Sequence, residues 1–261
     1  DLETLHGISL ELQARVAAAE LKGKVAATGR RSSAASSSRG PSGQMELLDV
    51  QKLAWAFAQL DVQDPELFKI LGHEALCARA ELSAQGASSL AWSFAKLGVQ
   101  DSGELFQALA EELEGRLAGE LTAQGLANVA WAFGTAAGLA SFARTAEQSG
   151  LFRVIAREAA GKLRTFRPKE LTNLLQAFAR AKDIGSLQMA PELQQLLEAS
   201  VKTVAEKAPD CDPRDLCILA WSLAKLDLVD ARVSHVLATS AARQLELMEP
   251  RFLCGQLLGL F

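Results

Sequence analysis

The chain has 261 residues, of which 49% are hydrophobic, and its 27 basic and 31 acidic side chains give a formal net charge of −4. This length is enough for one domain or a short repeat array, and the net charge alone excludes general attraction to nucleic acid or membrane. Ala and Leu dominate, Tyr is absent, and Val and Ile are too scattered to form strands, so the composition predicts an all-α fold.

Two segments precede the main part of the sequence. Residues 1–27 are predicted to form an amphipathic N-terminal helix, whose apolar positions are Leu2, Leu5, Leu10, Leu12, Val16 and Leu21. Residues 28–44 are rich in Ser and Gly and include three arginines, so they are interpreted as a solvated basic linker. A tether for nucleic acid is the alternative interpretation of this linker.

Residues 45–261 repeat one phrase. Leu53-Ala54-Trp55-Ala56-Phe57-Ala58 returns as Leu90-Ala91-Trp92-Ser93-Phe94-Ala95, and related phrases begin at residues 129, 174 and 219. The copies lie 37, 39, 45 and 45 residues apart. Repetition at such a period is typical of helical arrays. We expect units that start near residues 46, 83, 122, 167 and 212, with a partial sixth unit from residue 249.

Each unit is predicted to contain two helices, called here helix A and helix B. The phrase places apolar residues at the i, i+4, i+7 spacing of a buried helix face, as in Leu53, Phe57 and Leu60 or in Leu90, Phe94 and Leu97. One hairpin cannot bury the apolar faces of both helices, so neighbouring hairpins must stack. The prediction is an α-solenoid of about five helical hairpins of 37–45 residues each.

Capping signals mark where these helices begin. Asp64-Pro65-Glu66 places a proline in the first turn of a helix B after an aspartate cap, and Asp101 with Glu104 suggests a capping box for the next helix B. Later helices A are expected to start at Pro168, Pro213 and Pro250.

The phrases at residues 90–97 and 124–133 resemble the octotricopeptide and heptatricopeptide repeats of organellar RNA-binding proteins, and the resemblance covers roughly residues 45–261. It implies a right-handed α-solenoid in a mitochondrion or chloroplast, soluble or within a large complex, with single-stranded RNA as the commonest ligand. Similar proteins also serve as structural subunits of organellar ribosomes and other complexes. The chain departs from the pattern in its 45-residue intervals, its acidic balance and Gln176, which replaces the Trp.

A candidate binding face follows helix A. Residues spaced by four and then three positions lie on one side of a helix, and here small residues are predicted at the centre of that side: Ala56, Ser93, Ala132, Ala177 and Ser222. Asn and Ser could read base edges while Lys and Arg meet phosphates, and an ordinary solvated face is the alternative. The residues predicted to bind RNA are Lys52, Gln59, Ser89, Lys96, Asn128, Asn173, Arg180 and Lys225.

The recurring tryptophans and the C-terminal end leave alternatives open. We interpret Trp55, Trp92, Trp131 and Trp221 as core residues between repeats, and base stacking as the less favoured role. The functional hypothesis is an organellar RNA-binding protein that acts in RNA metabolism or translation and binds single-stranded or structured RNA along the helix A face. The alternative is a scaffold subunit of a large organellar complex, such as a ribosome or a bioenergetic assembly, that binds proteins through its acidic surface or apolar C-terminal end.

Catalytic and metal motifs are missing from the sequence. The three histidines have no metal-ligand spacing, and there is no Gly-rich phosphate loop and no Gly-x-Ser-x-Gly turn, so we expect no enzyme, cofactor or metal. No apolar run approaches the roughly 20 residues of a membrane span. The cysteines match no disulfide or zinc pattern and are expected to be reduced and buried: Cys77, Cys211, Cys217 and Cys254.

Overall fold

A computed structural model describes residues 46–136, 150–185, 187 and 189–245. This part of the chain contains ten α-helices and no strand, which confirms the all-α prediction. The predicted N-terminal helix at 1–27, the linker at 28–44 and the partial repeat from residue 249 lie outside the described residues, as does Pro250.

The described helices alternate between two layers. The helices A are α2 (Leu47–Gln59), α4 (Ala84–Leu97), α6 (Ala123–Ala136), α9 (Pro168–Asp183) and α11 (Pro213–Lys225). The helices B are α3 (Pro65–Cys77), α5 (Gly103–Glu112), α8 (Leu151–Lys162), α10 (Pro191–Lys207) and α12 (Ala231–Leu245).

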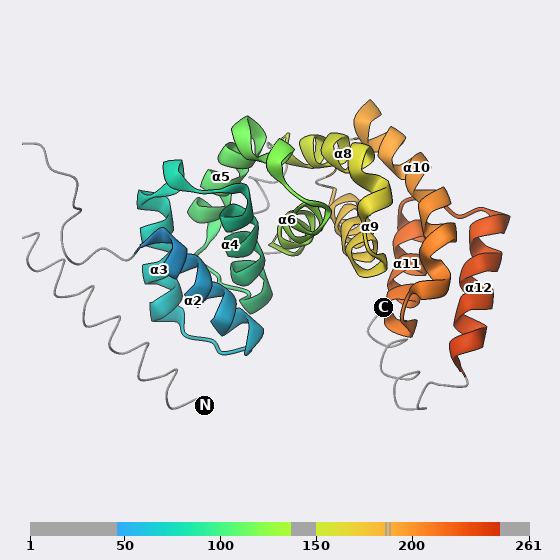
Figure 1. Cartoon of the computed structure of the whole chain (residues 1–261), viewed down its shortest axis with the longest axis horizontal. Helices are drawn as coiled ribbons and strands as arrows, with labels where there is room; N and C mark the ends of the chain where they lie inside the picture. Colours follow the sequence, from blue (N-terminus) through green and yellow to red (C-terminus); the bar gives the residue numbers. More distant parts are fainter. Residues whose placement is uncertain (1–45, 137–149, 186, 188, 246–261) are drawn as a thin grey trace, which may run out of the picture.

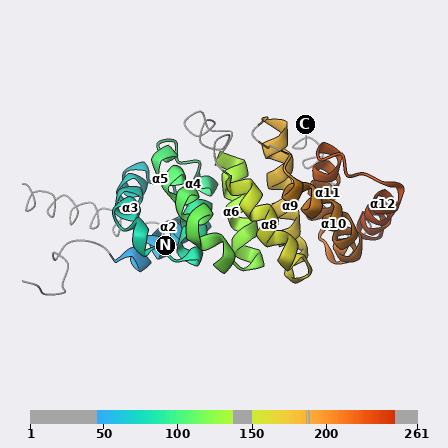
Figure 2. The same ribbon diagram turned by 90° about the horizontal axis from the view of Figure 1, so that it is seen from above.

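Helices of one kind stack on helices of the same kind. Each helix A contacts the next helix A from α2 to α11, and α3 contacts α5 while α10 contacts both α8 and α12. Figure 1 shows an arch whose inner side is formed by the helices A and whose outer side is formed by the helices B, and Figure 2 shows the repeats following one another along its length. The arrangement is an α-solenoid, while the right-handed sense that the resemblance implies stays a prediction.

Phenylalanines join the two layers. The buried rings of Phe94, Phe133 and Phe178 on helices A meet rings of helices B, with ring centroids of Phe68 and Phe94 5.0 Å apart, of Phe106 and Phe133 5.2 Å apart, and of Phe152 and Phe178 5.6 Å apart. Edge-on and tilted ring pairs of this kind add to the stabilisation from burial of apolar surface. The same contact therefore recurs in successive repeats and produces one continuous core.

The predicted helix starts are confirmed at some caps and corrected at one. The Asp64 carboxylate accepts a hydrogen bond of 3.0 Å from the backbone N–H of Leu67, and Pro65, Pro168 and Pro213 occupy first helical turns. The capping box of Asp101 and Glu104 is wrong. Helix α5 begins one residue later than that box requires, with Ser102 as its N-cap, and the Ser102 hydroxyl donates to the Val99 carbonyl at 2.6 Å.

The turn from helix A to helix B has a left-handed residue. Gly98 and Gly185 have φ of 62° and 74°, and Asp61 and Asp227 adopt φ of 55° and 59° at matching places. This conformation closes the helix end, and it ends α2 before Leu60, which is 58% exposed instead of lying on the predicted apolar stripe.

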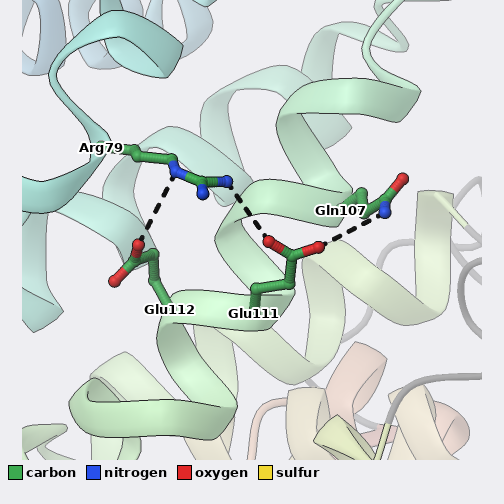
Figure 3. Close-up of polar contacts among 4 residues, drawn as sticks. All are labelled: Arg79, Gln107, Glu111 and Glu112. Carbon is green, nitrogen blue, oxygen red and sulfur yellow. Dashed lines mark hydrogen bonds and ion pairs between the residues drawn. The ribbon is translucent and has the colours of Figure 1, made fainter.

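Polar side chains join successive repeats on the outer layer. Arg79, after α3, lies 3.2 Å from a Glu111 carboxylate oxygen and 4.0 Å from one of Glu112, and Gln107 donates to Glu111 (Figure 3). Farther along, the Lys162 ammonium donates to the Leu121 carbonyl at 2.7 Å. Because the Arg79 and Glu111 side chains are about half exposed, their ion pair adds little stability.

The cysteine prediction is partly wrong. Cys211 is buried, but Cys217 is half-buried and Cys77 is exposed at the end of α3, where its Sγ lies 3.6 Å from His73 Nε2. Burial and the nearby carboxylates of Asp215, Asp212 and Asp210 raise the pKa of Cys211 to about 11. The described cysteines are free thiols, and Cys254 lies outside the described residues.

Candidate nucleic-acid interface

Each helix A carries one line of side chains that is not buried. The line consists of four residues spaced by four, three and four positions, which a helix places on one side. All twenty such residues on the five described helices A are exposed or half-buried, whereas the buried residues of these helices lie on their other sides. We call this surface the inner stripe, because the helices A that carry it form the inner side of the arch (Figure 1).

The inner stripe consists of four rows that cross the helices A. In the order α2, α4, α6, α9, α11, the first row is Leu48, Gln85, Gln124, Lys169 and Arg214, and the second row is Lys52, Ser89, Asn128, Asn173 and Ile218. The third row is Trp55, Trp92, Trp131, Gln176 and Trp221, and the fourth row is Gln59, Lys96, Thr135, Arg180 and Lys225.

All eight residues predicted to bind RNA lie on the inner stripe. Those in the second row are Lys52, Ser89, Asn128 and Asn173, and those in the fourth row are Gln59, Lys96, Arg180 and Lys225. The structure thus brings together residues from five separate repeats on one continuous surface. Their contact with RNA stays a prediction.

The small residues predicted at the centre of this face do not line it. Ser93, Ala132, Ala177 and Ser222 are fully buried and Ala56 is half-buried, because a step of four residues turns a helix by about 40° and points them at the neighbouring helix A. A Cβ added to Gly134 of α6 would lie 3.0 Å from the Ala177 backbone of α9. Small residues here let the helices A approach one another closely.

The tryptophans occupy the place that the small residues were expected to fill. Trp55 is 49% exposed, and Trp92, Trp131 and Trp221 are half-buried against the rim of the core. The prediction that they are inter-repeat core residues is confirmed in part: Trp92, Trp131 and Trp221 pack against the core, and the rings of Trp92 and Trp131 in successive repeats lie 6.5 Å apart. The prediction is wrong for Trp55. The position of the tryptophans, two residues before the core phenylalanine or its Leu223 counterpart, turns them about 200° away from it.

Basic side chains lie beside two of these rings, and one basic side chain bonds to the preceding repeat. The Lys96 ammonium lies 5.0 Å from the centroid of the Trp92 ring, and the Lys225 ammonium lies 6.0 Å from that of Trp221. Arg180 donates to the Thr135 hydroxyl of the preceding repeat at 3.0 Å, and burial lowers the pKa of Arg180 from its ordinary value. Because an arginine titrates far above neutral pH, the guanidinium stays charged.

The charge of the inner stripe differs from that of the chain. Its six basic side chains are Lys52, Lys96, Lys169, Arg180, Arg214 and Lys225, and none of its twenty residues is Asp or Glu, although acidic residues outnumber basic ones in the whole sequence. Acidic side chains adjoin it: Asp183 pairs with Lys225 at 2.6 Å, Asp49 lies 3.9 Å from Lys52, and Asp215 interacts electrostatically with Lys169 and Arg214. The inner stripe itself is basic on an acidic protein.

A protein-family model matches most of the chain. The model of the RNA-editing substrate-binding complex 6 protein family matches residues 31–232, which include the helices A and B from α2 to α11. The chain belongs to this family. No curated protein matches it. The octotricopeptide resemblance stays an expectation, because the matching family model is a different one, whereas the helical solenoid that it implies is present.

In this member of the RNA-editing substrate-binding complex 6 family, the sequence prediction missed the whole first row. Gln85, Gln124, Lys169 and Arg214 lie four residues before the predicted second row and are exposed. The i, i+4 spacing that places Lys96 on this face also applies to the first row. The first row lies one helical turn before the repeated phrase, so the phrase does not contain it.

The described residues form neither a metal-ligand cluster nor a membrane-spanning helix. In this part of the chain, no three His, Cys, Asp or Glu side chains gather closely enough to hold a metal ion. None of its helices combines the length and the apolarity needed to cross a membrane.

Proposed function

We propose that the chain binds RNA along the inner stripe as a subunit of an RNA-editing substrate-binding complex. The observation that carries the proposal is that the twenty residues of the inner stripe include six basic side chains and neither Asp nor Glu, in a chain with net charge −4. Lys and Arg neutralise phosphates and release counterions, which is the main sequence-independent source of affinity for RNA. Residence in an organelle belongs to the same proposal.

The polar residues of the second row supply a way to read bases. Asn128 and Asn173 lie on adjacent helices that are in direct contact, and both side chains are half-buried rather than covered. An amide offers both donors and an acceptor to the edge of an unpaired base. The cations of the first and fourth rows lie on either side of these amides, so a strand that follows the arch meets both kinds of contact.

The test is RNA binding by the whole chain across a salt series. The variant K52A/K96A/K225A removes three stripe cations without touching Arg180, whose bond to Thr135 also joins α9 to α6. Loss of three phosphate contacts should lower affinity and reduce the slope of log affinity against log salt by about 2 for a single strand. The matched control K69A/K202A/R232A removes three exposed cations from helices B and should leave the slope unchanged. Equal loss in both variants would contradict the proposal.

A scaffold function is the second candidate, favoured by the end of the array. Ala220 and Ala224 of α11 are exposed, although their counterparts Ala91 and Ala95 of α4 are buried by the next helix A. Ala220 and residues of α12 border an apolar hollow of about 330 Å³ whose wall includes Leu216 and Val233. If this end binds a protein of the complex, Ala220→Arg should abolish copurification of that protein while RNA binding persists. Unchanged copurification would remove this second candidate.

A further inference from the structure

The third row of the inner stripe contains all four tryptophans of the chain. Trp55 is 49% exposed, and Trp92, Trp131 and Trp221 pack against the core while part of each residue stays exposed to solvent. The fully buried rings of the helices A are Phe57, Phe94, Phe133 and Phe178, so the tryptophans lie outside the fully buried part of the core. Apolar side chains that recur on one exposed face mark a surface that a ligand covers.

Helix α9 shows that the solenoid tolerates a polar residue in this row. Gln176 occupies the tryptophan position there, yet the surrounding Leu174, Leu175 and Phe178 are fully buried, and α9 contacts both α6 and α11. The helices A therefore stack without a ring at this position. A purely structural reason for the other four tryptophans is correspondingly weak.

The spacing of the tryptophan rings and the lysines beside them suit the binding of nucleotides. The centroids of Trp92 and Trp131 are 6.5 Å apart with an angle of 38° between the rings, so the faces are neither parallel nor in mutual stacking contact. Lys96 lies one turn after Trp92, with its ammonium 5.0 Å from the ring, and Lys225 stands in the same relation to Trp221. A base on such a ring would have its own phosphate within reach of the adjacent ammonium.

We propose that the tryptophan row stacks the bases of unpaired nucleotides, so that the inner stripe selects single-stranded RNA over duplex. The proposal rests on the proposed RNA-binding function and adds the class of substrate. In an A-form duplex the bases are paired and stacked on one another, so their faces are closed to side chains and only phosphates and sugars are offered. Helix α9 has the amide of Gln176 at this position instead of a tryptophan ring, and this amide would form a hydrogen bond with the edge of a base.

Intrinsic fluorescence gives a direct test, because the chain has four tryptophans, all in this row, and no tyrosine. A short single-stranded RNA, the same RNA annealed to its complement, and an abasic strand of equal length are titrated into the protein. We expect the single strand to quench the indole emission and bind more tightly than the other two ligands. Equal affinity for all three without quenching overturns base stacking and leaves phosphate binding intact. Absence of binding to any of them overturns the proposed function and this inference together.

Variants separate stacking from charge. W92L/W131L keeps apolar volume but removes two rings, and should weaken single-strand binding by about 10-fold or more while leaving the salt slope as in wild type. W92F/W131F restores aromatic faces and should recover part of that affinity. Trp55→Leu changes the most exposed ring and serves if the double variant unfolds, which is checked by circular dichroism. Wild-type affinity in W92L/W131L and Trp55→Leu would contradict the proposal.

Discussion

Lys225 and Asp183 form the ion pair that competes most directly with a ligand on the inner stripe. Their charged atoms are 2.6 Å apart and both side chains are about half exposed, so the pair adds little stability in water. Asp183→Asn should therefore leave the melting temperature nearly unchanged and raise RNA affinity a few-fold at low salt, because Lys225 becomes free to meet a phosphate. Binding isotherms of the variant check this. Unchanged affinity would mean that Lys225 does not meet phosphate.

Gly134 is required by the close approach of α6 and α9. A Cβ at this position would lie 3.0 Å from Ala177 backbone atoms, which cannot move aside as a flexible side chain can. Gly134→Ala should lower the free energy of unfolding by about 1–3 kcal/mol in urea denaturation. Gly161→Ala in α8 is the control, since no atom lies within 4 Å of its added Cβ, and it should stabilise the protein by about 0.5–1 kcal/mol. Similar changes in both variants would contradict the packing account.

Thiol reactivity should differ between Cys77 and Cys211. Burial and nearby carboxylates raise the pKa of Cys211 to about 11, so almost no thiolate forms at pH 8, whereas Cys77 is exposed. In variants that retain one of the two as the sole cysteine, a disulfide reagent should label Cys77 in seconds to minutes and Cys211 only as the chain unfolds. Equal labelling rates under native conditions would contradict the burial of Cys211.

Helix starts are predictable where the cap bonds locally. Asp64 caps α3, so Asp64→Ala should cost about 1 kcal/mol in the free energy of unfolding, while Asp101→Ala should change it little, because Ser102 is the N-cap of α5. Urea denaturation of the two variants checks the difference. Sequence alone misplaced the α5 cap because Asp101 and Glu104 have the spacing of a capping box, and the bond of the Ser102 hydroxyl to Val99 is not visible in that spacing.

The phase of each helix A could be predicted only in part. The i, i+4 spacing of Leu and Phe identified the buried side of α4 correctly, but it failed in α2, where Leu60 follows the helix and is 58% exposed. The polar residues on the opposite side were placed on one surface. The residues predicted at the centre of that surface were wrong, because Ala132 and Trp131 are adjacent and either of them fits the helical period. The hydrophobicity of tryptophan favoured burial of the Trp131 ring. Only the close approach of Ala177 to Gly134 in the structure shows that the small residues take the buried position.

At the scale of the whole molecule, the period of the repeats predicts that the helical hairpins stack, and the curvature of the arch determines which helices face its inner side. Repeated phrases at 37 to 45 residues required a solenoid, because isolated hairpins leave apolar faces exposed. Which layer lies on the inside of the arch depends on how each repeat is rotated against the next, and no periodicity contains that rotation. The helices A from α2 to α11 line the inner side of the arch (Figure 1).

Photocrosslinking can locate RNA on the inner face of the arch. Thiouridine-substituted single-stranded RNA is crosslinked to the full chain, and the modified peptides are located by mass spectrometry. We expect crosslinks within α4, α6, α9 and α11, centred on the peptides that contain Trp92, Trp131, Gln176 and Trp221. Crosslinks confined to the helices B, or spread equally over both layers, would contradict this location of the RNA.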